Sequence, residues 1–423
     1  MAKMRAHRSV SRRQKPQRAL IVGVGRPKQN RAVKERSLDE LARLIDTAGG
    51  VVAARISQEV RRADPATFFG KGKVEEIALL ATEAAADLVA VDWELTPVQN
   101  KNLEDRMGLL VLDRTAVILD IFARRAATRE GKLQVELAQL KYLAPRLVGR
   151  GKVFSQQVGR IGTRGPGETA LEYDRRRVKD RIAFLKGNLE RVRSHRRLHR
   201  AKRDSVPVPM VSLVGYTNAG KSTLMNALTG AGVFVEDKLF ATLDPTVRRM
   251  KLPSGREILI ADTVGFISRL PHQLIEAFKS TFEEAASSAV LLHVIDASDE
   301  EARAHAEVVE KVLSELGMAG SPRIDAVNKC DCVQSHYRGD ERAVRISAIT
   351  GEGLPELVDM LDRNLRIDFR KVTLLLPMER GDVLSEIYRV GHVDAVKYGS
   401  RGIKVECRLH EKQCGRYREF TVR

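Results

Sequence analysis

The sequence predicts a multidomain α/β protein, and three observations carry this prediction. The chain has 423 residues, more than one ordinary hydrophobic core holds. Strand-sized apolar runs alternate with helical patterns over 18–126 and 206–368, which is typical of parallel sheets covered by helices. A heptad-like stripe over 127–205 predicts an antiparallel helical hairpin between them. Residues 369–423 indicate a small α+β domain, and residues 1–17 a disordered basic tail.

The N-terminal domain is predicted from four strand–helix pairs. We expect strands at 19–24, 51–57, 88–92 and 109–112, and helices at 37–48, 74–86, 96–107 and 114–125. The first helix has Ser37 as its N-cap and ends before Gly49 and Gly50. The run Gly70-Lys71-Gly72-Lys73 could hold a phosphate on backbone N–H groups, but a flexible turn that opens a helix explains it better.

The predicted hairpin has an apolar stripe on each helix and a cationic loop between them. The stripe residues are Leu133, Leu137, Leu140 and Leu147, then Leu171, Val178, Ile182, Leu185, Leu189 and Val192. Residues 137–167 contain six Lys or Arg, six Gly and no Asp or Glu. Such a loop suits folded RNA, which proteins read through phosphate contacts and shape. We assign RNA contacts to Arg150, Lys152, Arg160 and Arg164; the alternative is a coiled coil with a solvated cationic face.

The composition narrows the choice of partners and compartment. A formal net charge of +18 favours a polyanion: RNA, DNA or an anionic membrane surface. No apolar run approaches the roughly 20 residues that span a bilayer, so only peripheral membrane contact stays open. The N-terminus lacks an apolar signal core, although an organelle transit peptide would also be rich in Arg and free of acids. Four cysteines without a C-x-x-C pair fit the reducing cytoplasm. We expect a monomer.

The region 206–368 opens with a phosphate-binding motif. It matches G-x-x-x-x-G-K-S, follows a strand at 210–214 and precedes a helix at 223–228. Its members are Gly215, Tyr216, Thr217, Asn218, Ala219, Gly220, Lys221 and Ser222. The backbone N–H groups would face the phosphates of a nucleotide. Lys221 would reach the β- and γ-phosphates, and Ser222 would place its hydroxyl on Mg²⁺.

Three further motifs follow in the order of a guanine-nucleotide site. They are D-x-x-G (Asp262, Thr263, Val264, Gly265), N-K-x-D (Asn328, Lys329, Cys330, Asp331) and S-A-I (Ser347, Ala348, Ile349). Asp262 would hold Mg²⁺, and the Gly265 N–H would face the γ-phosphate. The Asp331 carboxylate can accept both N1–H and N2–H₂ of guanine, a pair of donors that adenine does not offer.

The remaining motif residues would shape the base pocket. Asn328 would brace its loop, and the stem of Lys329 would lie against the base. The Ala348 N–H could donate to guanine O6.

Residues 240–246 lie between the first two motifs and predict a nucleotide-sensing switch. They are Phe240, Ala241, Thr242, Leu243, Asp244, Pro245 and Thr246, of which we place the first five at the nucleotide. A switch needs a Thr on Mg²⁺, and Thr242 is our first choice and Thr246 the second. We therefore assign Mg²⁺ to Ser222, Thr242 and Asp262, and catalysis to Lys221, Thr242 and Gly265.

The residue after D-x-x-G departs from a self-sufficient catalyst. Many GTPases have a water-orienting Gln there, whereas this chain has Phe266. No arginine finger is identifiable from the sequence. We expect slow hydrolysis by the protein alone and stimulation by a partner that completes the site.

These motifs resemble the HflX family of the Obg-like GTPases. The forms Gly-Tyr-Thr-Asn-Ala-Gly-Lys-Ser, Phe-Ala-Thr-Leu-Asp-Pro-Thr and Asp-Thr-Val-Gly-Phe carry the likeness, as do the runs at 69–76, 113–115, 131–140 and 162–168. The resemblance covers about residues 18–368. It implies binding of GTP and GDP, binding to the large ribosomal subunit and its rRNA, and GTP-dependent splitting of stalled or idle ribosomes. Some relatives also hydrolyse ATP in the N-terminal domain, which only the 70–73 loop supports here.

Two other functions stay open from the residues alone. One is a GTP-gated, RNA-binding ribosome-assembly factor without splitting activity. The other is an RNA-remodelling ATPase that uses the N-terminal domain.

Overall fold

The computed structural model describes residues 16–27, 30–147, 170–203, 208–230, 238–271, 274, 285–286, 288–332, 337, 339–340, 343–365, 369–399, 402–410 and 414–422. The four predicted RNA-contacting residues of the hairpin tip and nearly all of the predicted basic tail lie outside this set. The chain divides into two compact units, Met1–Arg124 with Ala138–Asp180 and Arg125–Leu137 with Arg181–Arg423, and each is described by itself.

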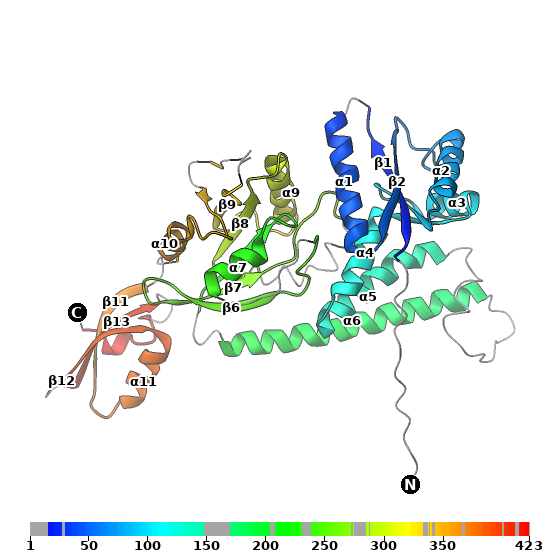
Figure 1. Ribbon diagram of the computed structural model, residues 1–423. Coiled ribbons are helices and arrows are strands. Elements are labelled where there is room, and N and C mark those ends of the chain that lie inside the picture. Colours follow the sequence, from blue (N-terminus) through cyan, green and yellow to red (C-terminus); the bar gives the residue numbers. More distant parts are fainter. Residues whose placement is uncertain are drawn as a thin grey trace, which may run out of the picture. The chain divides into compact units, whose positions relative to one another are not determined.

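The first unit contains a four-stranded parallel sheet with helices on both faces. The elements are β1 (Arg18–Gly25), α1 (Arg31–Thr47), β2 (Val51–Glu59), α2 (Lys71–Glu83), β3 (Leu88–Val91), α3 (Pro97–Met107), β4 (Leu110–Asp113) and α4 (Arg114–Arg125). The strand order is β2-β1-β3-β4, and β1 and β3 are buried, which explains their unbroken apolar runs. Figure 1 shows α1 on one side of β1 and β2, and α2 and α3 on the other. The predicted parallel α/β domain is confirmed.

The predicted starts of two helices were wrong. α1 begins six residues before Ser37, at Arg31, because the side chain of Asn30 caps its first turn. Ser37 lies inside the helix, and its hydroxyl donates to the carboxylate of Asp92. α2 begins at Lys71, three residues earlier than predicted. Helix propensity does not locate a cap: the start of α1 depends on a side-chain hydrogen bond of Asn30, whereas α2 begins after Gly70 without one.

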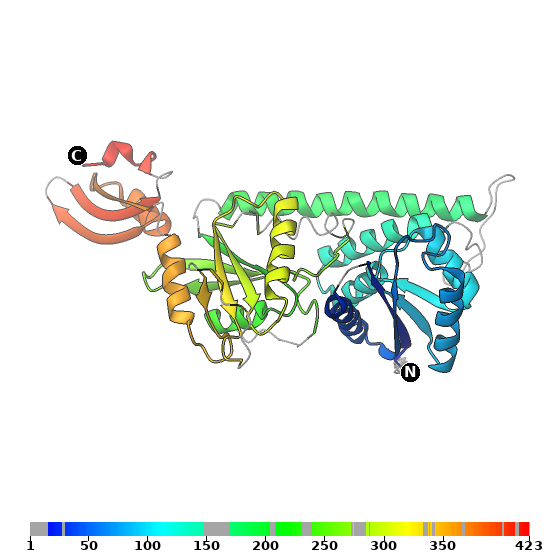
Figure 2. The ribbon, with the colours of Figure 1, turned by 90° about the horizontal axis from the view of Figure 1, so that it is seen from above.

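Two helices form the predicted hairpin region. They are α5 (Arg129–Leu143), which continues into the 3-10 turn η1 (Ala144–Leu147), and α6 (Ala170–Arg203), a single long helix in Figure 2. Within the second unit, Leu137, Leu185 and Leu189 of the predicted stripe are buried. Arg181 of α6 donates twice to the Glu136 carboxylate of α5, at 2.7 and 3.0 Å. The two helices are therefore joined there as the heptad pattern predicted.

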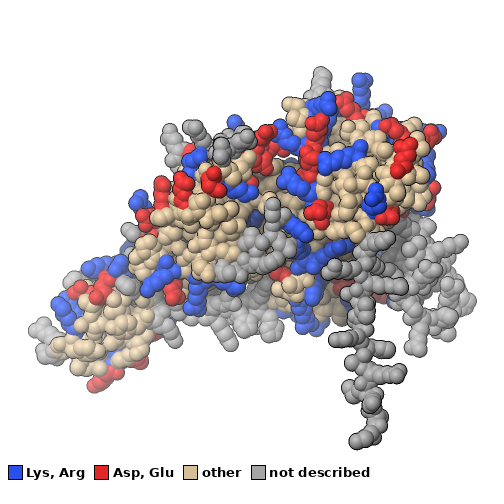
Figure 3. All heavy atoms as spheres, in the orientation of Figure 1, with Lys and Arg blue, Asp and Glu red and all other residues tan. Residues whose placement is uncertain are grey.

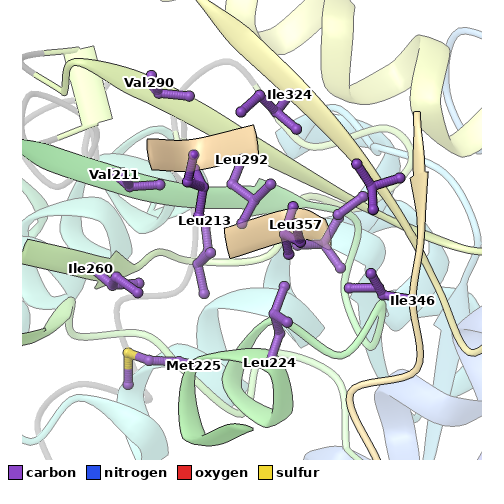
Figure 4. Packing of buried hydrophobic residues seen from close by; sticks show 14 of the residues in the cluster. Val211, Leu213, Leu224, Met225, Ile260, Val290, Leu292, Ile324, Ile346 and Leu357 are labelled. Atoms are coloured by element: carbon purple, nitrogen blue, oxygen red, sulfur yellow. The ribbon is translucent and has the colours of Figure 1, made fainter. Parts of the chain in front are cut away.

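The second unit also contains a six-stranded sheet of order β10-β9-β8-β5-β7-β6. Its elements are β5 (Met210–Gly215), α7 (Lys221–Thr229), β6 (Thr246–Lys251), β7 (Glu257–Asp262), β8 (Val290–Asp296), α9 (Ala302–Glu315), β9 (Arg323–Asn328), β10 (Val344–Arg345) and α10 (Leu354–Asn364). Neighbouring strands are parallel except β6 and β7. Leu213 and Leu292 of the sheet pack with Leu224 of α7 and Leu357 of α10 (Figure 4). Because β5, β7 and β9 end at one edge, the loops that carry the nucleotide motifs emerge together.

The C-terminal segment forms the predicted small α+β domain. Strands β11 (Phe369–Leu376), β12 (His392–Gly399) and β13 (Gly402–His410) pair antiparallel in the order β11-β13-β12. Helix α11 (Gly381–Val390) packs Ile387 against Leu374 and Val405 of the sheet, and the short turn η3 (Arg418–Phe420) follows. Among the helices of the described residues, none has the length and apolar character needed to cross a membrane.

Candidate guanine-nucleotide site

The P-loop joins β5 to α7 at the carboxyl edge of the sheet. Gly220 precedes α7 with φ +92°, and a Cβ at this position would lie 2.3 Å from Nδ2 of Asn328. Both the left-handed backbone and the close approach of Asn328 therefore require glycine. Asn218 has φ +63°, in the left-handed region that asparagine adopts more readily than most residues other than glycine.

Lys221 is buried, with 7% of its surface exposed. Its Nζ donates to the carbonyl oxygens of Gly215, at 3.2 Å, and Tyr216, at 2.8 Å, so the ammonium is held over the loop. Burial lowers the pKa of Lys221 to about 8, and the carboxylate of Asp262 opposes this shift. A bound phosphate would favour the charged ammonium, so Lys221 is suited to the predicted phosphate contact.

Three side chains with oxygen atoms meet beside the P-loop. The hydroxyl oxygens of Ser222 and Thr242 lie 2.9 Å apart, and both hydroxyls donate to Oδ2 of Asp262, at 2.6 and 2.9 Å. Oδ1 of Asp262 is buried and has no hydrogen-bond partner among the described residues, and burial raises the pKa of this carboxyl group. Mg²⁺ prefers oxygen ligands and would give the buried oxygen a partner. The three residues therefore fit the predicted Mg²⁺ site.

Buried residues lie on both sides of Thr242, the predicted sensing residue of the switch segment. Phe240 and Leu243 are buried, and Phe240 has φ +54°. Thr242 lies between them, within hydrogen-bonding distance of Asp262. Thr246, the second candidate for the sensing role, begins β6 and pairs with Asp262 in the ladder of the β6–β7 hairpin. The geometry favours Thr242, whose role stays a prediction.

A pocket lies over these groups. It is lined by Thr217, Asn218, Gly220, Lys221, Ser222, Thr223, Lys238, Phe240, Ala241, Thr242, Thr263 and Gly265. The P-loop, the switch and D-x-x-G thus come together, and Lys238 joins them although nothing in the sequence marked it. Leu243 and Asp244, which we had placed at the nucleotide, do not line this pocket. Leu243 is buried in the core, and the Asp244 carboxylate accepts hydrogen bonds from Ala127 and Thr128 before α5.

The segment after D-x-x-G runs along the P-loop. The Phe266 N–H donates to the Gly215 carbonyl at 3.1 Å, and its carbonyl accepts from the Thr217 N–H at 2.7 Å. The side chain of Phe266 is fully buried, and so is nearly all of Val264. Phe266 therefore neither reaches the pocket nor offers a polar group that could orient water.

The predicted base-binding loops are tied together by Asn328. Its Nδ2 donates to the Ala219 carbonyl and its Oδ1 accepts from the Ala348 N–H, each at 2.9 Å. One buried side chain thus joins N-K-x-D to the P-loop and to the S-A-I loop, as the bracing role requires. The single N–H of Ala348 is used in this bond, so donation to guanine O6 would have to share it. That assignment stays a prediction.

Lys329 and Asp331 flank the expected position of the base. Lys329 has φ +65°, and its Nζ lies 2.6 Å from Oδ2 of Asp296, at the end of β8. Asp296 was not predicted, because an acidic residue that ends a strand gives no signal until the fold brings β8 beside β9. Asp331 is exposed at the mouth of the loop.

The other members of the base loops support the backbone or face solvent. Cys330 is half-buried, and its Sγ donates to the Val327 carbonyl at 3.1 Å. Ser347 is buried, and its hydroxyl accepts from the Thr350 N–H at 3.1 Å. Ile349 is 79% exposed, so its side chain contributes little packing to the loop.

The candidate phosphate loop of the N-terminal domain gains no further support. Gly70 caps α2 through its backbone only, and Nζ of Lys73 lies 3.0 Å from the Glu76 carboxylate in the same helix. Binding of ATP to this domain stays a prediction.

Four protein-family models match consecutive parts of the chain. Their descriptions are GTP-binding GTPase N-terminal (residues 35–123), GTP-binding GTPase Middle Region (125–203), 50S ribosome-binding GTPase (210–329) and HflX C-terminal domain (332–418). The matches cover the N-terminal sheet, the hairpin, the nucleotide site and most of the C-terminal segment.

Curated proteins of similar length also resemble this chain in sequence. GTPase HflX from Caldanaerobacter subterraneus subsp. tengcongensis is 48% identical over 388 residues, which cover 92% of this chain and 91% of that protein. GTPase HflX from Escherichia coli (strain K12) is 44% identical over 364 residues, 84% of this chain and 85% of that protein. A crystal structure of a GTP-binding protein from the archaeon Sulfolobus solfataricus with GDP has a TM-score of 0.44 and 24% identity, covering 82% of this chain and 98% of that one.

Proposed function

Because this chain belongs to the HflX family of GTPases and is a GTP-hydrolysing enzyme, we propose that it associates with the large ribosomal subunit and splits stalled or idle ribosomes under the control of GTP. It would do so in the cytoplasm as a monomer. Its nucleotide domain matches a family described as 50S ribosome-binding, which supports this partner. The observation that carries the proposal is a switch-type nucleotide site on a chain that also has a basic helical hairpin.

The arrangement of Ser222, Thr242 and Asp262 supports a GTP-dependent switch. These residues would hold Mg²⁺, which would neutralise part of the phosphate charge when bound. Thr242 and the Gly265 N–H would be held in place only while a γ-phosphate is present, as in other switch loops. The buried Phe266 leaves the attacking water unoriented, so hydrolysis would be slow until the ribosome completes the site.

The charge of α6 supports an RNA partner. Residues 170–203 contain thirteen Lys or Arg and four Asp or Glu. Among its described side chains, Arg175, Lys179, Lys186 and Arg191 are exposed. On the N-terminal sheet domain, at the upper right of Figure 3, basic and acidic side chains are instead interspersed. A cationic helix that leads from a cationic, glycine-rich loop suits the phosphates of folded rRNA.

A pelleting assay with purified large subunits tests this proposal. Binding should be stronger with a non-hydrolysable GTP analogue than with GDP. Replacing Arg150, Lys152, Arg160 and Arg164 with Ala should weaken binding and flatten its dependence on salt, because each lost phosphate contact removes about 0.7–0.9 from the slope of log K against log[salt]. Nucleotide affinity should stay near that of the wild type.

A matched variant controls for total charge. Arg43, Arg61, Arg62 and Arg106 are exposed on the N-terminal domain, and their replacement by Ala also removes four charges. If this control weakens ribosome binding as much as the hairpin variant does, bulk charge explains the effect. Binding that does not change with salt would contradict an RNA contact through the hairpin.

Two experiments separate the other candidate functions. A sedimentation profile of intact ribosomes with the protein and a GTP analogue should show subunits if it splits ribosomes, and intact particles if it is an assembly factor. ATP hydrolysis that survives in a Lys221→Ala variant would support an RNA-remodelling activity in the N-terminal domain.

A further inference from the structure

Asp244 holds the start of α5, although it belongs to the switch segment. Its Oδ2 accepts hydrogen bonds from the N–H groups of Ala127 and Thr128, each at 2.8 Å, and its Oδ1 accepts from the Thr128 hydroxyl. The same hydroxyl accepts from the Gly131 N–H at 2.9 Å. A carboxylate thus fixes the two residues that lead into α5, including Thr128, whose hydroxyl caps the first turn, and it comes from a segment 116 residues away in the chain. Negative charge is favourable at the N-terminus of a helix.

The contact between Asp244 and α5 leaves no room for a side chain at Gly131. A Cβ at this position would lie 2.3 Å from Oδ1 of Asp244 and 3.1 Å from Oγ1 of Thr128. The first distance is shorter than any ordinary contact, so a larger residue would displace the carboxylate or the helix. Glycine inside a helix is unfavourable, and here it permits the approach of Asp244.

Asp244 is close to the switch residue Thr242 along the chain. One residue, Leu243, separates it from Thr242, so the Cα atoms of Thr242 and Asp244 are at most about 7 Å apart. Leu243 is only 3% exposed, and this packing limits the slack between its neighbours. Thr242 in turn donates to Asp262 in the Mg²⁺ site. A displacement of Thr242 would therefore be passed to the carboxylate of Asp244.

We propose that Asp244 is a positioning residue that couples the nucleotide state at Thr242 to the N-terminus of α5, the first helix of the hairpin. The proposal deepens the proposed function and rests on the assignment of Thr242 as the γ-phosphate sensor. With GTP bound, Thr242 is held at the Mg²⁺ site and Asp244 caps α5. After hydrolysis, release of Thr242 withdraws the cap. By reciprocity, a partner that orders α5 favours the GTP-bound switch.

Two variants test the contact between Asp244 and the start of α5, one on each side of it. Asp244→Ala removes the oxygens that accept from Ala127 and Thr128, whereas Gly131→Ala favours the helix and sterically displaces the Asp244 carboxylate. Both should weaken binding of a non-hydrolysable GTP analogue by about tenfold and leave GDP affinity nearly unchanged, within the range usual for coupling between sites. Gly187→Ala is the matched control, because a Cβ at Gly187 in α6 would have no atom within 4 Å among the described residues.

Hydrogen exchange of the free protein gives a readout that a static cap would not change. In the wild type, the Ala127 and Thr128 amides should exchange at least about tenfold more slowly with the GTP analogue than with GDP, and Asp244→Ala should abolish the difference. Equal exchange in both wild-type states, or a normal ratio of GTP to GDP affinity in both variants, overturns the proposal. An unchanged ratio in Thr242→Ala overturns the sensor assignment and the proposal with it. Because no ribosome is present, these outcomes do not depend on ribosome binding.

Discussion

Replacement of Asn328 by Ala should loosen the whole nucleotide site, because one side chain ties three loops together. Its two hydrogen bonds, to the Ala219 carbonyl and from the Ala348 N–H, are both 2.9 Å long and buried. A buried bond contributes about 1 kcal/mol net, so the variant should lose about 2 kcal/mol, and more if either backbone group is left without a partner. If the loops stay in place, the loss appears as lower stability. If they relax, it appears as weaker nucleotide binding, by up to about thirtyfold in Kd.

Titration with a fluorescent guanine nucleotide and thermal unfolding together measure this loss. Asn364→Ala is the control, because Asn364 is exposed and, among the described residues, its side chain makes a local bond to the Met360 carbonyl, at 2.9 Å. The control should change neither quantity appreciably. If Asn328→Ala also kept both its affinity and its melting temperature, the bond network would not brace the site and the reasoning from its geometry would be refuted.

Three other outcomes are expected. Asp331→Asn should move base preference from guanine to xanthine, since the amide offers one donor and one acceptor; retained GTP affinity without a gain for XTP in a competition assay would show that the base is misplaced. GDP affinity should be constant below about pH 8 and fall by up to tenfold per pH unit above it. The pKa of Lys221 is about 8 in the free protein and a bound phosphate raises it, so binding above this pH takes up a proton. An affinity that isothermal titration shows to be unchanged up to about pH 9 would contradict this. Arg114→Met should lower the free energy of unfolding by about 3–5 kcal/mol, because it removes the guanidinium that lies 2.7 Å from the fully buried Asp92 carboxylate. Arg124→Met breaks an exposed ion pair and should cost less than about 1 kcal/mol. Equal denaturant midpoints for the two variants would refute this prediction.

Much of the architecture was predictable because it depends on short-range patterns. The central strands β1 and β3 are buried on both faces, and such strands must be continuous apolar runs, which are visible in any sequence. The predicted helix 114–125 coincides with α4. The start of α1 was predicted wrongly, because Asn30 caps it while Ser37 bonds to Asp92, a residue 55 positions away. A cap depends on one hydrogen bond, and a local pattern does not show which of two polar residues will make it.

The candidate site likewise has features that the sequence predicted and features that only the structure shows. The identities of Lys221, Ser222, Asp262 and Asp331 as candidate phosphate, magnesium and base residues followed from the sequence, since those chemistries require particular residue types at short, regular spacings. The structure added the buried Oδ1 of Asp262, which has no hydrogen-bond partner among the described residues. It also added the two hydrogen bonds that join Asn328 to two other loops, and the ion pair between Lys329 and Asp296.

The chemistry of nucleotide recognition is thus encoded locally in this chain, whereas the connection of the switch to its surroundings is not. Asp244 stands inside a nucleotide motif, and its sequence context placed it at the nucleotide. The fold instead directs its carboxylate to Ala127 and Thr128, 117 and 116 residues away. No periodicity or spacing relates residues so far apart, because their proximity arises only when α5 and the switch segment pack in the same unit. Contacts of that kind, which decide what a change at the nucleotide can move, are determined by tertiary packing.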